Sequence, residues 1–322
     1  MKKGIQNMSS GGRLLSTLFS AVGLLPLRVL YGLSDTVAFL AGRIVGYRRK
    51  VIRKNLTLSF PDKDLKDLRK IERDFYRFLG DYFVETLKLG RMSEDNIKSR
   101  MRFENEEEVR HYLDAGRNVT LYLGHYCNWE WMSSIPLHFD KELHMGQIYH
   151  PLESKAADEA FLKIRGHCGA TSIKMADTLP TLMKWRREGK PFMVGFIADQ
   201  VPLFEGMHYF ADFLHQETPT FTGPERLSRM FDSVVFYCDI RRDKRGYYTC
   251  RYVKMTDNPK SLPQFKLTQK YYDMLAESID RQPALWLWSH NRWKRTKTDF
   301  VRLSLFGQTV QRMSLFLLET VC

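Results

Sequence analysis

The chain has 322 residues, with 50 Lys and Arg against 37 Asp and Glu, which gives a formal net charge of +13. This length can bury a large core, and the basic excess favours an anionic partner: a membrane surface, a phosphorylated substrate, nucleic acid or an acidic protein. No zinc-finger, homeodomain or RNP-type motif occurs, which argues against nucleic acid. Five cysteines without a Cys-x-x-Cys pair argue against a zinc site or a disulfide framework.

The first 46 residues are expected to form a helical segment that attaches to a membrane. The uncharged run 14–27 is interrupted by Pro26 and is shorter than the about 20 residues that span a bilayer. It also does not end in the small-x-small cleavage site of a signal peptide, so a cleaved signal peptide is not expected. Further on, one helix face is apolar, with Leu30, Leu33, Val37, Leu40 and Ile44. A helix packed on the protein's own core and a true span that includes Pro26 are the alternatives.

A basic cluster follows this helix: Arg48, Arg49, Lys50, Arg53 and Lys54. Each cation near an anionic membrane contributes about 1 kcal/mol of attraction. The cluster is therefore expected to contact the membrane or an acidic carrier protein. Its alternative is the solvated end of an ordinary helix.

Helical and strand patterns alternate through the rest of the chain. The predicted helices cover 65–82, 154–167, 179–187, 224–231 and 267–281. The predicted strands cover 119–123, 146–149, 191–198 and 284–288, and a hairpin joins 234–240 to 247–254. This alternation predicts an α/β fold with a mixed sheet flanked by helices, in one domain over 47–300. The tail, 301–322, has no assigned role.

The strand 119–123 leads into Gly124 and His125, and a carboxylate follows at Glu130. Asn128 is expected to cap a helix that begins there. Because ligands bind at the carboxyl ends of strands, His125 is a candidate general base, with Glu130 accepting a hydrogen bond from its other ring nitrogen. A chance spacing and a nucleophilic Cys127 are the competing interpretations, although Cys127 is poorly placed for activation by His125.

The segment 124–130, Gly-His-Tyr-Cys-Asn-Trp-Glu, resembles the His-x4-Asp/Glu block of the lysophospholipid acyltransferase superfamily. In this form it is similar to the bacterial lipid A biosynthesis acyltransferases that add lauroyl or myristoyl chains. Further blocks resemble that family in order at 47–61, 149–169, 195–200, 213–224 and 288–294, so the likeness spans roughly residues 25 to 298. The chain departs from the family pattern at Cys127, His150, Leu214-His215 and Asn291.

The resemblance implies a glycerolipid acyltransferase-like fold and a reaction in which an acyl carrier protein thioester acylates a hydroxyl of a lipid A precursor. It implies no metal and no organic cofactor. Other candidate residues for substrate or oxyanion binding are Arg165, Asn128, Asp199 and Gln200. Asp199 and Gln200 follow a buried strand and are expected at the same sheet edge as His125. The alternative for Arg165 is an ordinary surface arginine on a helix. The alternative for Asp199 and Gln200 is that they cap the loop.

The expected location is the cytoplasmic face of a bacterial inner membrane. A second basic segment, with Arg292, Lys294 and Arg295, lies among Trp286, Trp288 and Trp293 and could line an interfacial mouth or simply end the domain. Acylation of another glycolipid or a glycerophosphate is the nearest rival activity. A non-catalytic peripheral membrane protein is the rival from a different class.

Overall fold

The computed structural model describes residues 8–302. Most of the unassigned tail, 303–322, therefore lies outside the described residues. Within them, the helices are α1 (Ser10–Leu24), α2 (Leu27–Phe39), α3 (Arg49–Ser59), α4 (Leu65–Leu89), α5 (Glu94–Arg100), α6 (Glu106–Asp114), α7 (Lys155–Arg165), α8 (Thr178–Arg187), α9 (Gly223–Met230) and α10 (Lys266–Arg281). A π-helical turn, η1 (Leu40–Val45), extends α2.

Seven strands form the main sheet in the order β1-β9-β8-β2-β5-β3-β4. Only β8 and β9 pair antiparallel, so the sheet is mixed, as predicted. The strands are β1 (Met101–Glu104), β2 (Val119–Leu123), β3 (His144–Tyr149), β4 (Thr171–Lys174), β5 (Phe192–Ile197), β8 (Val234–Lys244) and β9 (Tyr247–Thr256). A separate hairpin pairs β6 (Met207–Phe213) with β7 (Gln216–Phe221).

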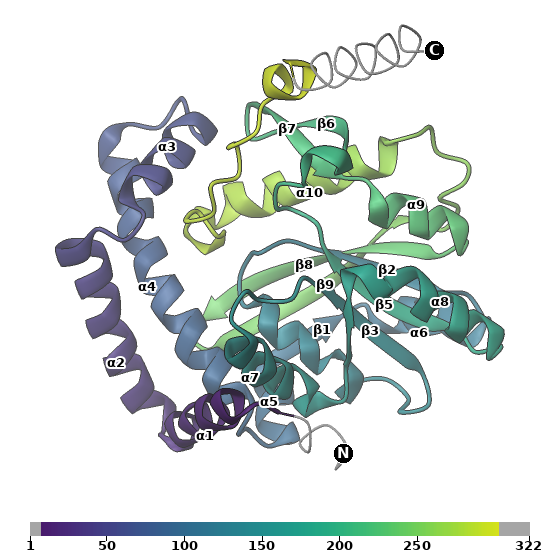
Figure 1. Ribbon diagram of the computed structural model, residues 1–322, viewed down its shortest axis with the longest axis horizontal. Helices are drawn as coiled ribbons and strands as arrows, with labels where there is room; N and C mark the ends of the chain where they lie inside the picture. Colours follow the sequence, from purple (N-terminus) through teal and green to yellow (C-terminus); the bar gives the residue numbers. More distant parts are fainter. Residues whose placement is uncertain (1–7, 303–322) are drawn as a thin grey trace, which may run out of the picture.

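The central strands are covered on both faces. Every residue of β2 is buried, in keeping with the continuous apolar run that an internal parallel strand requires. Figure 1 shows α10 lying along the sheet above β8 and β9, and its buried Tyr271, Tyr272 and Leu275 belong to the main core. This arrangement leaves the carboxyl ends of β2 and β5 beside the buried face of α10.

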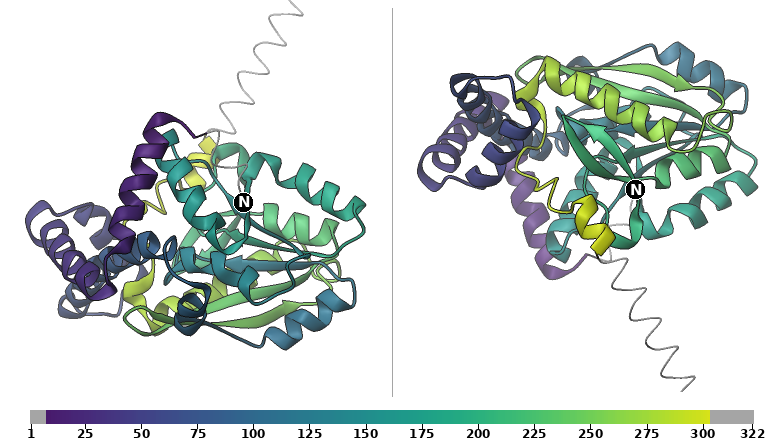
Figure 2. Two further views of the ribbon diagram at one scale, coloured as in Figure 1. Left: turned by 90° about the horizontal axis from the view of Figure 1, so that it is seen from below. Right: turned by 90° about the horizontal axis from the view of Figure 1, so that it is seen from above.

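The N-terminal helices lie at one side of the molecule. Figures 1 and 2 show α2 alongside the long helix α4, with α1 crossing near α7. The chain turns sharply between α1 and α2, where Pro26 precedes the first residue of α2. Among the described residues no single helix has the length and apolarity to cross a membrane; Ser10–Leu24 and Leu27–Val45 reach them only together, as a pair bent by 113°.

Three local predictions differ from the structure. The segment predicted as a strand at 284–288 holds a short 3-10 turn, η6 (Pro283–Leu285), and a single bridge between Trp286 and Tyr126. The element after Asn128 is a 3-10 helix, η2 (Trp129–Leu137), and the Asn128 side chain does not cap it. The sequence patterns also missed the β6–β7 hairpin, whose turn residues Leu214 and His215 both have positive φ.

Candidate active site

The carboxyl ends of β2 and β5 bring His125 and Asp199 together. The two strands are parallel neighbours, and Leu123 lies opposite Ile197. His125 and Asp199 each come two residues after this pair, so the strand register places them side by side. Gly124 permits the close packing, because a Cβ there would lie 2.7 Å from Leu275 Cδ1 of α10.

The His125 ring has a partner on each nitrogen. Nδ1 lies 2.6 Å from Asp199 Oδ1, and Nε2 lies 3.2 Å from the side-chain nitrogen of Gln200. With Nδ1 protonated and donating to Asp199, Nε2 keeps its lone pair and accepts from the Gln200 amide. This is the tautomer that a general base requires. The ring is only partly buried, and Nε2 is the nitrogen that no carboxylate holds.

Asp199 is buried and held by several donors. Its Oδ2 accepts from the His125 backbone N–H at 2.9 Å and from Trp286 Nε1 at 2.7 Å. Burial alone would raise the pKa of Asp199, but the adjacent His125 ring and these hydrogen bonds outweigh it and lower the pKa to about 2. Asp199 is therefore a carboxylate at any physiological pH.

In the described part of the chain, Glu130 makes no hydrogen bond or ion pair with the His125 ring, whereas the sequence predicted such a contact. Its carboxylate forms a bidentate pair with Arg165, whose Nε and Nη2 lie 2.8 Å and 2.6 Å from the two oxygens. Tyr82 of α4 also donates to Glu130, at 3.3 Å. Glu130 is the second residue of the 3-10 helix η2, whereas Asp199 follows β5, whose register with β2 places it beside His125. Arg165 is correspondingly a partner of Glu130 rather than a free cation.

Asn128 also has a different partner from the one expected. Its side chain makes no cap hydrogen bond and instead donates to Glu85 Oε2 at 2.7 Å. Both residues are buried. The loop between His125 and Glu130 is thus tied to α4 by Asn128, Glu130 and the indole of Trp131, which donates to the Glu85 carbonyl at 3.1 Å.

Cys127 is placed poorly for nucleophilic chemistry. It is fully buried, and burial raises the pKa of its thiol well above the usual value. Its φ of 53° is in the left-handed region, which explains why this position suits glycine. The departure from the family pattern is therefore a strained backbone position filled by a small side chain.

Only part of the first basic cluster is free at the surface. Arg48 donates to the Ser289 carbonyl at 3.0 Å, while Arg49 and Arg53 lie 3.5 Å and 2.8 Å from the carboxylate of Glu72. Lys50 and Lys54 form no ion pair with any described residue. Arg292, from the second basic segment, is fully buried and donates to the Pro219 carbonyl.

Several residues that support the site were missed from the sequence. Tyr271 and Tyr272 of α10 donate to the carbonyls of Leu123 and Ala198, at 2.7 Å and 2.9 Å, and so hold the two strand ends. Trp286 binds Asp199 directly. Consecutive buried tyrosines on a helix were the available signal, but their partners depend on tertiary packing. Across residues 8–302, no three His, Cys, Asp or Glu side chains gather as a metal site.

A histidine paired with a buried carboxylate at the carboxyl edge of a mainly parallel sheet is an arrangement typical of α/β enzymes. A model of the bacterial lipid A biosynthesis acyltransferases matches residues 13–295, and the chain belongs to this family. It is therefore an acyltransferase of lipid A biosynthesis, and a lipid A precursor is its substrate. A comparison with curated proteins found no match.

Proposed function

We propose that the enzyme transfers a fatty acyl chain from an acyl carrier protein thioester to a hydroxyl of a lipid A precursor. The observation that carries this proposal is the His125 ring, with Nδ1 held by Asp199 and Nε2 held only by the neutral Gln200 amide among the described residues. A base in this state can deprotonate an alcohol, and family membership supplies the acyl chemistry.

In the proposed step the acceptor hydroxyl displaces the Gln200 amide from His125 Nε2. As the hydroxyl oxygen attacks the thioester carbonyl, its proton passes to Nε2, and Asp199 stabilises the resulting imidazolium. The tetrahedral intermediate then collapses, the carbon–sulfur bond breaks, and the leaving thiolate takes the proton from His125. An ester and a free thiol result, so the reaction requires neither a metal nor an organic cofactor.

In this mechanism the Glu130–Arg165 pair positions the loop that carries His125. Glu130 fixes the end of the loop that carries His125, because Arg165 and Tyr82 hold it from two different helices. Arg165 Nη1 makes no hydrogen bond to any described residue, and it can contribute to an oxyanion site together with the backbone N–H groups at the start of η2.

The N-terminal segment, 1–46, is proposed to hold the enzyme on the cytoplasmic face of a bacterial inner membrane. Its outer face is apolar: Leu14, Val29, Leu33, Val37, Leu40 and Ile44 are all exposed, and Ile44 retains 68% of its accessible surface. Exposed apolar side chains on consecutive helices are typical of an interfacial membrane site. Lipid A biosynthesis acyltransferases are usually membrane-associated, in agreement with this assignment.

Point substitutions test the attachment better than a deletion does, because α2 contributes to the packing of α4. We expect Val37→Glu with Ile44→Glu to move the protein from anionic vesicles into the soluble fraction in flotation assays. Ser99→Glu with Thr171→Glu, at two exposed positions outside the N-terminal segment, adds the same charge and is the matched control. An alkaline carbonate wash that fails to extract the wild-type protein would contradict interfacial attachment and favour a span.

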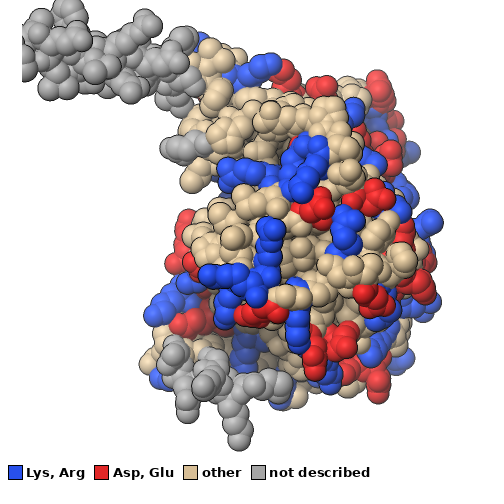
Figure 3. Space-filling model, turned by 90° about the vertical axis from the view of Figure 1, so that its right-hand side faces the viewer, with Lys and Arg blue, Asp and Glu red and all other residues tan. Residues whose placement is uncertain are grey.

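Two basic patches remain candidates for docking the acidic carrier protein. The first patch is Lys50 and Lys54 on α3, and the second is Lys294 with Arg295 in the second basic segment. None of the three lysines forms an ion pair with a described residue. The face shown in Figure 3 carries intermixed basic and acidic side chains and no continuous basic field. Charge reversal at Lys50 and Lys54 in detergent micelles should raise the KM for acyl carrier protein and leave acyl coenzyme A kinetics unchanged. Unaltered carrier-protein kinetics would leave membrane attraction as their role.

Purified enzyme with a lipid A precursor and lauroyl- or myristoyl-acyl carrier protein provides the direct test of function. Mass spectrometry should detect one added acyl chain, which must be absent with His125→Ala. Glycerol 3-phosphate and lysophospholipid serve as competing acceptors. Preferential acylation of either would replace the proposed acceptor, and no transfer to any acceptor by folded enzyme would contradict the mechanism.

A further inference from the structure

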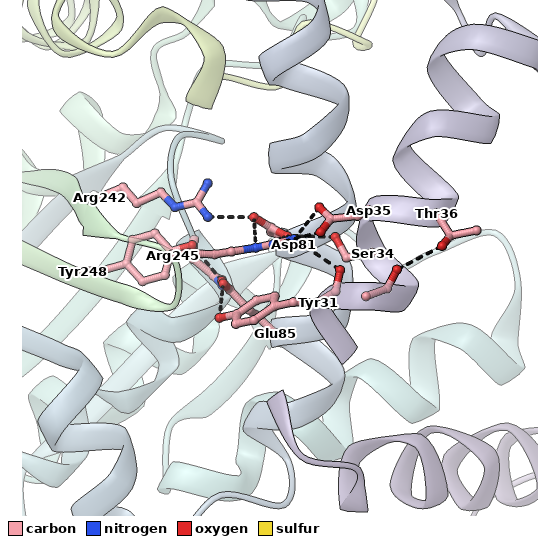
Figure 4. A network of polar contacts seen from close by, with 11 residues as sticks. Tyr31, Ser34, Asp35, Thr36, Asp81, Glu85, Arg242, Arg245 and Tyr248 are labelled. Atoms are coloured by element: carbon pink, nitrogen blue, oxygen red, sulfur yellow. Dashed lines mark hydrogen bonds and ion pairs between the residues drawn. The ribbon is translucent and has the colours of Figure 1, made fainter. Parts of the chain in front are cut away.

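Helix α4 carries two buried carboxylates one turn apart, Asp81 and Glu85, between α2 and the β8–β9 hairpin. Figure 4 shows both pointing into a polar network with residues of α2 on one side and of the hairpin on the other. Asp81 is 2% exposed and Glu85 is completely buried. Buried carboxylates are costly unless several donors satisfy them, so this network is a built feature of the fold.

The Asp81 half of the network fastens α2 to the protein. Ser34 donates to Asp81 at 2.8 Å, and Arg242 donates to the same carboxylate at 2.6 Å. Arg245 bridges Asp81 to Asp35 of α2, with contacts of 2.5 Å and 2.7 Å. These contacts use polar residues of α2, whereas Val29, Leu33 and Val37 of the same helix are exposed.

The Glu85 half of the network reaches the loop 125–130, which carries His125 and is called the catalytic loop below. Tyr31 of α2 donates to Glu85 Oε1 at 2.9 Å, while Asn128 and Tyr248 donate to Oε2, each at 2.7 Å. Asn128 lies between His125 and Glu130 in the chain, and its Oδ1 has no partner among the described residues. Glu85 is thus the described hydrogen-bond partner of that buried side chain.

We propose that Glu85 is a positioning residue that couples helix α2 to the catalytic loop, through Tyr31 on one carboxylate oxygen and Asn128 on the other. The hydroxyl of Tyr31 fixes the Glu85 carboxylate, and the fixed carboxylate holds Asn128 and with it the backbone from His125 to Glu130. Hydrogen bonds to ionised groups are stronger than those between neutral groups. One carboxylate that accepts from two elements can therefore fix the position of one relative to the other. The helix that carries the apolar surface is therefore also part of the active-site scaffold.

The test measures coupling between Tyr31 and Asn128 in detergent micelles, where membrane attachment is not limiting. Tyr31→Phe removes one hydroxyl, and we expect kcat to fall about tenfold with the KM for acyl carrier protein unchanged. Hydrogen exchange of the amides at 125–131 should quicken by a similar factor. Thr36→Val is the matched control on the same helix, because Thr36 bonds only to the Gly32 carbonyl among the described residues.

The double variant decides whether Glu85 links the two sites. If the link exists, Asn128→Ala already breaks it, so adding Tyr31→Phe should lower kcat little further. Additive losses would overturn the proposal. So would wild-type exchange at 125–131 in Tyr31→Phe, or faster exchange spread evenly over the whole chain.

The kinetic part of this test rests on the proposed acyl transfer, whereas the exchange part does not. Wild-type enzyme that fails to acylate a lipid A precursor would refute the proposed function. The exchange rates of wild type, Tyr31→Phe and Thr36→Val would still decide whether α2 and the catalytic loop are coupled.

Discussion

Two pairs of polar side chains lie at the two ends of one short loop, His125 with Asp199 and Glu130 with Arg165, and they arise in different ways. His125 and Asp199 are separated by 74 residues, yet strand register alone places them 2.6 Å apart. Glu130 is close to His125 in sequence, but its carboxylate turns to Arg165 and Tyr82. Distance along the chain is therefore a poor guide to which carboxylate orients a histidine at a sheet edge, whereas neighbouring parallel strands are a good one.

The two pairs also differ in what they can do chemically. The Asp199 pair leaves His125 Nε2 with a lone pair that only the Gln200 amide contacts among the described residues, so it supports proton transfer. The Glu130 pair joins the guanidinium of Arg165 to a carboxylate by two hydrogen bonds and supports position. Substitutions that replace each charged side chain by a neutral one of similar shape test this difference between the two pairs.

Removal of the base or its orienting carboxylate should have the largest effect. His125→Ala should abolish transfer, and Asp199→Asn should lower kcat by about 10²-fold or more, because the amide can neither select the Nδ1–H tautomer nor stabilise the imidazolium. Steady-state kinetics on folded protein checks both. Near-normal turnover of purified His125→Ala would refute the mechanism.

Breaking the second pair should lower the stability of the fold. Arg165→Gln leaves the Glu130 carboxylate buried without its counter-charge, and we expect a loss of about 3 kcal/mol in the free energy of unfolding. Adding Glu130→Gln should restore part of that loss, since both charges are then gone. Urea unfolding of the wild type, the two single variants and the double variant measures these free energies. Additive losses would show that the two side chains act independently.

Much of the fold followed from the sequence, because periodic apolar residues marked β2, β5, α4 and α10. His125, Asp199 and Gln200 were also placed correctly at one sheet edge. The choice between Glu130 and Asp199 as the histidine's partner was not accessible, because it depends on the sheet order. The contact between Asn128 and Glu85 joins segments that no local pattern relates.

Acidification should destabilise the protein through His290, which lies near the His125–Asp199 pair. Burial lowers the pKa of His290 to about 4, and its Nε2 has no partner among the described residues. The unfolded chain binds this proton near pH 6.5, so stability is complete above that pH and is lost as pH falls towards 4.

We expect His290 to contribute about 1 to 2 kcal/mol of destabilisation at pH 5 relative to pH 7. Comparison of wild type with His290→Gln by urea unfolding at both pH values isolates this contribution. Asp199, whose pKa is lowered to about 2, contributes stability above pH 4 that is lost only in stronger acid. Equal pH dependence in the two proteins would show that His290 is not the group responsible.

Cys127 should show the smallest effects. Cys127→Ser should keep substantial activity, and Cys127→Gly should change stability by no more than about 1 kcal/mol, because relief of the positive φ offsets the lost side chain. Cys127→Val is the matched contrast, since a β-branched residue is strained at this φ. Loss of activity in a folded Cys127→Ser enzyme would support a catalytic thiol instead.

The central claim is that Asp199, and not Glu130, orients the histidine base. Nitrogen-15 NMR of labelled histidine at alkaline pH, with the signal assigned by its absence in His125→Ala, reports the tautomer directly. The wild type and Glu130→Gln should both carry the proton on Nδ1, and Asp199→Asn should lose this preference. Loss of the Nδ1–H tautomer in Glu130→Gln together with its retention in Asp199→Asn would contradict the account.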